Sequence, residues 1–318
     1  MSNQTTVTEF LLLGFFDVRE LQILHFVIFL AAYLAALMRN LLIITIATLN
    51  YKLHSPMFFF LINLSLQDLG TISVTVPKSM SNSLLNIRSI SYSGCVIQVF
   101  CLICFFGANL SLLTVMAYDR YVAICKPLHY EIIMNRKACI QMAASAWIAG
   151  VMYSAVHTGN TFSLPFCHSN IINQFFCEVP QLLKLSCSDT YRRELAALAF
   201  SVFLVLGCFA FIVVSYVQIF TAVWRIPSEQ GHQKAFSTCI PHLTVVSLLL
   251  STAIIAYTKP ISDNLSPLDL LAAVLYSVVP PLMNPVIYSM RNREIQAALK
   301  KLLQKLIRSK NSMSMFLS

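Results

Sequence analysis

The stretch Met116–Tyr130 reads MAYDRYVAICKPLHY and closes a mostly apolar run from Val99 to Val115. At the end of that run it places a carboxylate, a guanidinium and a phenol: Asp119, Arg120 and Tyr121. Charged side chains are tolerated where a membrane helix reaches water, and a positive excess just beyond marks the cytoplasmic side. Three bases follow within a short span: Lys126, Arg136 and Lys137. The stretch therefore predicts the inner end of a membrane helix, although an isolated Asp-Arg pair would indicate only a snorkelling end.

The composition around this stretch is that of a membrane protein. Of 318 residues, 57% are hydrophobic and 11% are charged, whereas a soluble domain carries charge on roughly a quarter of its residues. The net charge of +9 is spread over short loops and the tail. Nucleic-acid binding needs a concentrated basic patch, so we expect no nucleic-acid partner.

Apolar runs of membrane-spanning length predict an all-α, seven-transmembrane helix bundle in the lipid bilayer. The bundle occupies residues 22–290, after an N-terminal segment 1–21 and before a tail 291–318. The expected spans are 22–49, 56–80, 95–124, 139–162, 196–224, 237–258 and 268–290. Seven spans place the two termini on opposite sides, and Lys and Arg are concentrated on the side of the C-terminus. We therefore expect the N-terminus outside and the C-terminus inside.

The two terminal segments carry their own signals. Asn3 opens an N-glycosylation sequon, Asn3-Gln4-Thr5, which suits an extracellular N-terminus. In the tail, four aliphatic residues recur at helical spacing among bases: Ile295, Leu299, Leu302 and Leu306. This pattern predicts a short amphipathic helix lying in the inner interface of the membrane.

Further strings stand in or next to the inner halves of the second, fifth, sixth and seventh predicted helices. They read LHSPMF at 53–58, LSLQD at 64–68, SY at 215–216, KAFSTC at 234–239 and NPVIY at 284–288. Together with Met116–Tyr130, these strings closely resemble, in order and spacing, the odorant receptors, a family of rhodopsin-like G-protein-coupled receptors. The resemblance covers nearly the whole chain, from Asn3 to Asn292.

The resemblance implies a function and a location. The expected protein is not an enzyme and needs no cofactor. It binds a small volatile, neutral and mostly apolar odorant within the bundle and activates a stimulatory, olfactory-type heterotrimeric G protein, which raises cAMP. We expect it as a multi-pass protein in the plasma membrane, with olfactory cilia implied by the family.

The resemblance also assigns candidate residues. Those expected for coupling and the activation switch are Asp119, Arg120, Tyr121, Tyr216, Lys234, Asn284, Pro285 and Tyr288. In an inactive state Asp119 is expected to hold Arg120, with Lys234 as a further partner of Asp119. Those expected to contact the ligand are Leu102, Ile103, Phe106, Phe200, Ser201, Leu204, Ala253, Ile254 and Tyr257. Most are apolar and none carries a fixed charge, so an ion bound among them would lack a partner.

Four cysteines lie at or beyond the expected extracellular boundary, where oxidation is favoured: Cys95, Cys167, Cys177 and Cys187. Four cysteines allow three pairings, and their spacing alone does not choose among them. The family pattern implies Cys95–Cys177 and Cys167–Cys187. A zinc site with His168 is the competing interpretation, but no paired ligand spacing supports it, so we expect no metal.

Placing a carboxylate inside the membrane has a high free-energy cost, and Asp68 is the residue of the predicted membrane region for which this cost is largest. It should therefore face the bundle interior and polar partners. Asn40 and Asn284 occupy the family positions that share its pocket. Many odorant receptors have an acidic residue where this chain has Asn109. One charge fewer weakens cation coordination, and the sequence therefore does not assign a sodium ion to this pocket.

The main alternative to a receptor is a polytopic transporter or channel, which also tolerates prolines and a buried acid. Transporters usually show internal repeats and interrupted helices, and this sequence shows no such repeat. The chain also departs from the family pattern at three positions: Arg39, Pro241 and Leu250. Arg39 is expected either to snorkel to the inner headgroups or to pair inside the bundle near Asp68.

Overall fold

The structure is a computed structural model. It describes residues 7–14, 18–49, 55–166, 169–187, 191–225, 229–257, 267–291, 295–297, 300 and 304. Within these ranges the side chains of residues 191–195, 234, 256, 257, 267 and 289–291 are not described.

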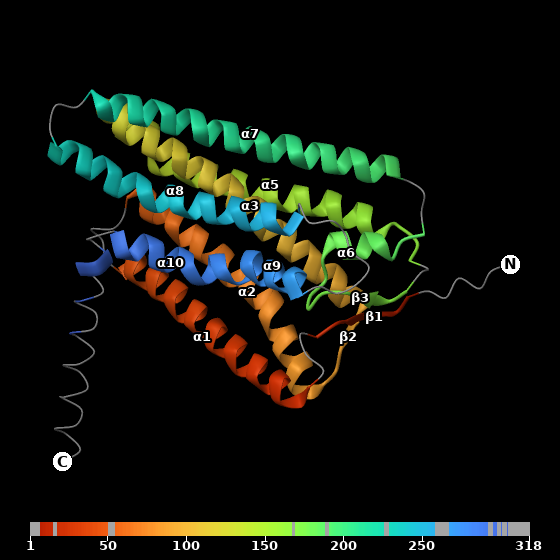
Figure 1. The fold of residues 1–318 in the computed structure, drawn as a ribbon. Coiled ribbons are helices and arrows are strands. Elements are labelled where there is room, and N and C mark those ends of the chain that lie inside the picture. Colours follow the sequence, from red (N-terminus) through yellow and green to blue (C-terminus); the bar gives the residue numbers. More distant parts are fainter. Residues whose placement is uncertain are drawn as a thin grey trace, which may run out of the picture.

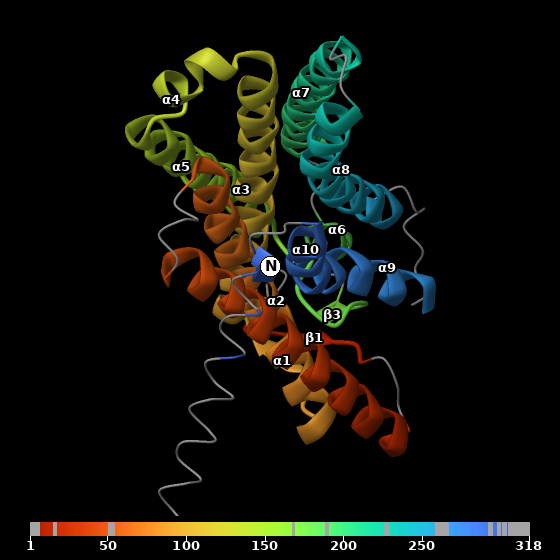
Figure 2. The ribbon, with the colours of Figure 1, turned by 90° about the vertical axis from the view of Figure 1, so that its left-hand side faces the viewer.

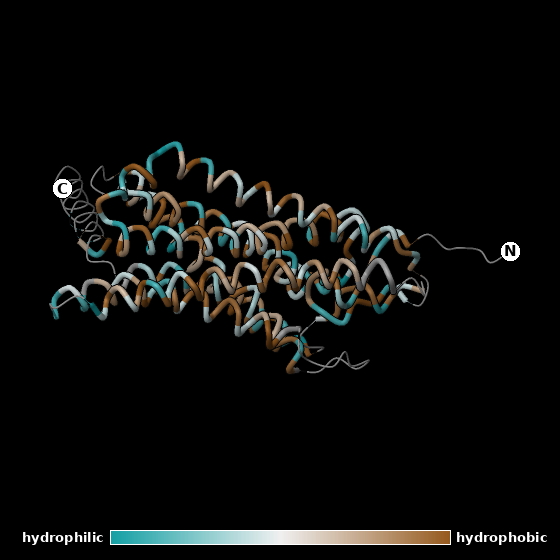
Figure 3. Tube along the Cα trace, turned by 90° about the horizontal axis from the view of Figure 1, so that it is seen from above, coloured by the Kyte–Doolittle hydropathy of each residue, from teal (hydrophilic) through white to brown (hydrophobic). Residues whose placement is uncertain are grey.

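The chain forms a bundle of long helices (Figure 1). The long helices are α1 (Arg19–Leu49), α2 (Pro56–Leu85), α3 (Tyr92–Cys125), α5 (Arg136–Phe162), α7 (Tyr191–Trp224) and α8 (Glu229–Tyr257). Two shorter helices follow, α9 (Pro267–Ser277) and α10 (Val279–Arg291). The six long helices are each apolar and long enough to cross a membrane, and the α9–α10 pair supplies a seventh span. Hydrophobic residues run along the length of the helices (Figure 3), so the seven-transmembrane fold predicted from the sequence is confirmed.

The seventh span is bent, which the sequence analysis did not predict. It was expected as one helix over 268–290, but α9 and α10 meet at a bend of 41°. Pro280 and Pro281 stand just after the bend. Proline has no N–H to donate and its ring clashes with the preceding turn, so consecutive prolines kink a helix at this point.

Helix α3 lies at the centre of the bundle and packs against α2, α5, α7 and α8 (Figure 2). Its contact with α5 is close because of a glycine. A Cβ at Gly150 would lie 2.6 Å from the carbonyl oxygen of Cys104, so only glycine allows this approach. Trp147 of α5 donates its indole N–H to Asn63 Oδ1 of α2 at 3.1 Å, which ties a third helix to the same pair.

A small three-stranded sheet covers one end of the bundle (Figure 1). Strand β1 (Glu9–Leu12) pairs antiparallel with β2 (Ser89–Ser91) and parallel with β3 (Ile171–Ile172). Phe10 and Leu12 of β1 are fully buried beneath it, with Phe10 packed edge-on against Phe166 at 5.5 Å. We call this the sheet end of the bundle, and the opposite end, where α3 finishes, the Arg120 end.

The Arg120 end carries the short connection between α3 and α5. It consists of the 3-10 turn η2 (Pro127–His129) and helix α4 (Tyr130–Ile133). A further short helix, α6 (Val179–Lys184), belongs to the loop at the sheet end. Asn3 and most of the predicted tail helix lie outside the described residues. Ile295, the first residue of its apolar face, is buried against the bundle core.

Candidate functional site

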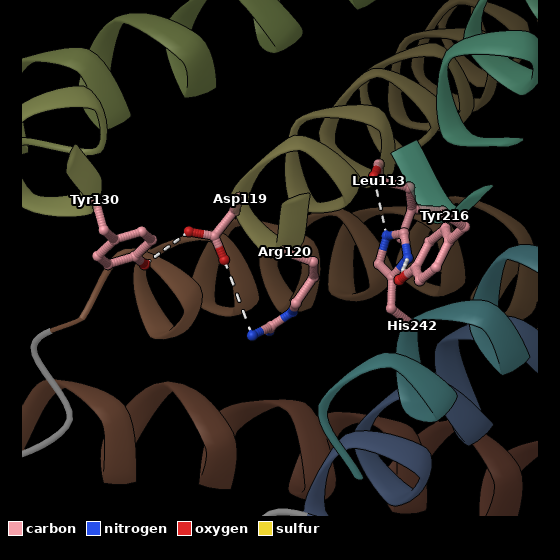
Figure 4. Close-up of polar contacts among 6 residues, drawn as sticks. All are labelled: Leu113, Asp119, Arg120, Tyr130, Tyr216 and His242. Carbon is pink, nitrogen blue, oxygen red and sulfur yellow. Dashed lines mark hydrogen bonds and ion pairs between the residues drawn. The ribbon is translucent and has the colours of Figure 1, made fainter. Parts of the chain in front are cut away.

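The candidate site at the Arg120 end is built from α3, α4, α7 and α8 (Figure 4). Asp119 and Arg120 are the last charged residues of α3, and both are buried. Arg120 Nη1 lies 3.9 Å from Asp119 Oδ2. Arg120 Nε has no hydrogen-bond partner among the described residues. The guanidinium is thus held by one long ion pair, and part of its donor capacity is unused.

Tyr130 holds the other oxygen of Asp119. Its hydroxyl donates to Asp119 Oδ1 at 2.8 Å. Burial, followed by the neighbouring carboxylate of Asp119, raises the pKa of the Tyr130 phenol, so it stays a donor. A hydrogen bond to a carboxylate is stronger than one between neutral groups. Tyr130 therefore ties the α3–α5 connection to the acid that holds Arg120.

His242 of α8 joins three helices at its two ring nitrogens, and it is fully buried. Nε2 lies 2.9 Å from the carbonyl oxygen of Leu113 on α3, and Nδ1 lies 2.9 Å from the hydroxyl of Tyr216 on α7. A carbonyl only accepts, so Nε2 carries the proton; in the neutral ring Nδ1 then accepts from Tyr216. This bridge holds α8 and α7 against α3 at Leu113, about two helical turns before Arg120, and Figure 4 shows it beside Arg120.

A second polar cluster lies deeper in the bundle. Asn284 Nδ2 lies 3.1 Å from each carboxylate oxygen of Asp68. Asn40, expected in the same pocket, instead donates to the carbonyls of Ala36 and Pro281, each at 3.0 Å. Pro285, four residues further on, has no N–H to donate to the Pro281 carbonyl, so Asn40 fastens α1 to a carbonyl that lacks its helical hydrogen bond.

Three buried atoms of this cluster and of the nearby Tyr288 have no partner among the described residues: Asn40 Oδ1, Asn284 Oδ1 and the Tyr288 hydroxyl. Buried polar groups are normally satisfied by protein or ordered water. The cluster therefore has the composition of a hydrated polar pocket. Arg39 lies outside it and donates from Nη1 to the carbonyl of Leu282 on α10 at 3.4 Å, so it bonds within the bundle.

The residues predicted to bind ligand are not gathered in one cluster. Leu102, Ile103 and Phe106 of α3 are half-buried, and each packs against a different buried hydrophobic cluster. On α7 and α8, Phe200, Leu204 and Ile254 remain 49%, 38% and 58% exposed. Ala253 is half-buried, and the side chain of Tyr257 lies outside the described residues, as does that of Lys234.

Ser201 has a partner that the sequence did not suggest. Its hydroxyl lies 2.7 Å from His157 Nε2 of α5 and 2.8 Å from the carbonyl of Ala197. The Tyr153 ring lies tilted against that histidine, with centroids 4.4 Å apart. The hydroxyl is therefore part of a polar group between α5 and α7.

The disulfide implied at the sheet end is present. Cys95 at the start of α3 is bonded to Cys177 of the loop before α6, with an S–S distance of 2.05 Å. Cys187 is also disulfide-bonded, but its expected partner Cys167 lies outside the described residues. That pairing stays a prediction.

Comparison with known proteins agrees with this architecture. The sequence model described as "Olfactory receptor" matches residues 29–306. Human olfactory receptor 14A16 is 51% identical over 304 residues, covering 96% of this chain and 98% of its own. Human olfactory receptors 14C36 and 14I1 are 50% and 52% identical, over 98% and 96% of this chain and 100% and 98% of their own.

This chain belongs to the olfactory receptor family. It is accordingly a multi-pass receptor of the plasma membrane and not an enzyme, and the transporter or channel alternative is not favoured.

Two residues of this olfactory receptor's site were missed by sequence reasoning. His242 is not among the residues predicted from the sequence, although a histidine inside an apolar helix needs polar partners and so signals a buried contact. Tyr130 stands inside the stretch that decided the fold but was given no role, because its contact depends on the path of the loop. Tyr121 and Pro285 lie on α3 and α10 as expected.

Proposed function

We propose that this olfactory receptor binds a small, neutral, mostly apolar odorant and activates a stimulatory, olfactory-type G protein, which raises cAMP. In this proposal the sheet end faces outward and the Arg120 end faces the cytoplasm. The excess of Lys and Arg on the side of the C-terminus supports the orientation. The observation that carries the proposal is the buried Arg120 cluster, which lies at the end of α3 beside the inner ends of two other helices.

The cluster suggests how the switch works. In the described arrangement Tyr216 donates to His242, and His242 donates to the carbonyl of Leu113, so α8 is held against α3. Outward movement of the inner end of α8 must break the second bond, and separation of α8 from α7 breaks the first. Tyr216 would then be free to donate elsewhere, and the unused donor capacity of Arg120 leaves it able to engage a new acceptor. Ligand binding shifts the population toward that opened state.

The ligand class follows from the side chains at the expected level of the bundle. Leu102, Ile103 and Phe106 offer apolar area, and the polar groups nearby are the hydroxyl of Ser201 and its partner His157. None of the expected contact residues has a carboxylate or a basic side chain; the histidine belongs to a neighbouring position on α5. An unpaired ion would pay a desolvation penalty that nothing here offsets. A neutral molecule with one hydrogen-bonding oxygen fits best.

A ligand panel read out by cAMP tests this function in cells that express a stimulatory olfactory-type G protein. We expect neutral apolar compounds to activate the wild-type receptor, and Phe106→Ala to shift their potency at an unchanged surface level. Ile97→Ala, an exposed position on the same helix, is the matched control and should leave potency unchanged. Activation by carboxylates or amines alone would refute the neutral-ligand proposal.

A further inference from the structure

A groove of about 380 Å³ lies between α3 and α5 on the outside of the bundle. Val115 of α3 and Ala138, Met142 and Ala146 of α5 form its apolar walls. It occupies the half of these helices toward the Arg120 end. Nearer the sheet end, Gly150 brings α5 into close contact with the backbone at Cys104, so the groove is confined to the other half.

One wall of this groove is polar although it lies on the outer surface of two helices that are apolar and long enough to span a membrane. Gln141 and Ser145 line it and are exposed. Neither side chain makes a hydrogen bond within the part of the chain that the structure describes. An amide and a hydroxyl facing hydrocarbon without partners are unfavourable. Both therefore require hydrogen-bond acceptors or donors from outside the protein.

A base continues the same face toward the membrane surface. Lys137, Gln141 and Ser145 are spaced four residues apart, so they lie above one another at intervals of about 6 Å. Lys137 is exposed, and the described residues include no acid paired with it. Arg136 precedes it, but at 100° per residue it points to the far side of α5 from Ala138 and Ser145.

The amino terminus of α5 adds to the positive potential at the mouth of the groove. The helix begins at Arg136, and the Asn135 side chain accepts from the backbone N–H of Ala138 at 3.0 Å. The backbone N–H groups of Arg136 and Lys137 have no hydrogen-bond partner among the described residues, and the helix dipole favours an anion there. The order of groups is thus positive charge, then hydrogen-bond donors, then an apolar trough.

We propose that this groove holds one anionic glycerophospholipid of the cytoplasmic leaflet. Its phosphate lies at Lys137 and the amino end of α5, its ester oxygens accept from Gln141 and Ser145, and one acyl chain follows Val115 and Met142. The inference rests on the orientation proposed above, because anionic lipids are concentrated on the cytoplasmic side. A sterol, with a single hydroxyl, would leave the charged mouth unused.

Native mass spectrometry of the purified receptor, titrated with phosphatidylserine or phosphatidylcholine, tests the proposal. We expect wild type to retain phosphatidylserine preferentially. Lys137→Gln should lower that retention about fivefold, the effect of one basic residue at a membrane surface. Ser145→Leu, which fills the groove, should remove the bound lipid. Arg136→Gln is the matched control, with the same loss of charge on the other side of α5, and should change little.

Three outcomes would overturn the proposal. These are equal retention of the two lipids, equal loss in Lys137→Gln and Arg136→Gln, or a cholesterol adduct insensitive to both. Thermal unfolding of each variant in phosphatidylcholine shows that it is folded. If Ser145→Leu does not fold, the comparison of Lys137→Gln with Arg136→Gln at the exposed helix end decides alone. The readout involves no signalling, so its failure is distinct from failure of the proposed function.

Discussion

At the scale of single residues, the molecule depends on a few buried polar contacts in an apolar bundle. His242 has both ring nitrogens satisfied by two different helices, whereas Arg120 has one long ion pair and an unpartnered Nε among the described residues. A satisfied buried group stabilises the arrangement that satisfies it, and an incompletely satisfied one is ready to exchange partners. On this difference we base the proposal that the switch lies between His242 and Arg120.

Replacing Tyr216 with Phe tests that placement. The variant loses the hydroxyl donated to His242 Nδ1 and leaves a buried acceptor unpaired, which costs about 1–3 kcal/mol. We expect a lower thermal unfolding midpoint in the purified receptor and higher cAMP without ligand, because α7 and α8 are no longer tied together.

Tyr118→Phe is the control for this change, since Tyr118 is a half-buried tyrosine of α3 whose hydroxyl has no described hydrogen bond. Equal unfolding midpoints and equal basal cAMP in Tyr216→Phe and wild type would show that the bridge does not hold the inactive arrangement.

At the scale of elements, the sheet end is organised by β1. This strand pairs with the two loop strands β2 and β3, which are far apart in the sequence. Phe10 is fully buried beneath it and contacts Tyr92 and Phe166. The three-stranded sheet of β1, β2 and β3, which forms a cap on the sheet end, therefore depends on a strand of only four residues.

Truncating Phe10 to Ala should loosen the whole cap. Loss of a buried phenylalanine costs about 3–5 kcal/mol, so amide exchange at residues 89–91 and 171–172 should become faster. Glu9→Ala removes an exposed side chain from the same strand and should leave exchange unchanged. Unchanged protection in Phe10→Ala would mean that the cap is held by the Cys95–Cys177 disulfide alone.

A second contact at this end is sensitive to pH. Tyr276 of α9 donates to Glu178 Oε1 at 2.8 Å. Burial raises the pKa of Glu178, and Asp269 adds to the effect, while hydrogen bonds from Tyr276 and Gln174 oppose it. The folded state thus binds the proton more tightly than the unfolded state. Stability from this group is full below its ordinary pKa and declines as pH rises through the raised one.

We therefore expect the unfolding midpoint of the wild-type receptor to fall as pH rises above the ordinary carboxyl range. Glu178→Gln keeps an acceptor for Tyr276 without the titration, so its midpoint should fall less over the same pH window. Parallel curves for the two proteins would assign the pH dependence to other groups.

At the scale of the whole molecule, the number of spans and the stretch around Arg120 were predictable because each is encoded locally, by apolar length and by a contiguous string. The bend between α9 and α10 was not, although Pro280 and Pro281 were visible, because prolines are tolerated in membrane helices without breaking them. The strands escaped prediction because two to four residues show no periodicity.

The contacts of the candidate site are likewise of two kinds: those encoded locally in the sequence, which were predictable, and those that depend on helix packing, which were not. Asp119 and Arg120 are neighbours in sequence, so their pairing was expected. The contacts of His242 with Leu113 and Tyr216 join three helices, and their existence depends on how those helices pack. The expected ligand-contact residues were chosen only because the family binds ligands at the same levels of these helices. In the structure the three α3 residues among them pack against separate hydrophobic clusters.

The central claim is that Arg120 couples ligand binding to a G protein. The most direct test is guanine-nucleotide exchange on a purified stimulatory G protein, with receptor reconstituted in lipid vesicles and an agonist from the cAMP panel. We predict that agonist accelerates exchange with wild type and not with Arg120→Ala, at equal amounts of folded receptor. Equal acceleration by Arg120→Ala, or agonist-dependent ion flux across the vesicles without any exchange, would contradict it.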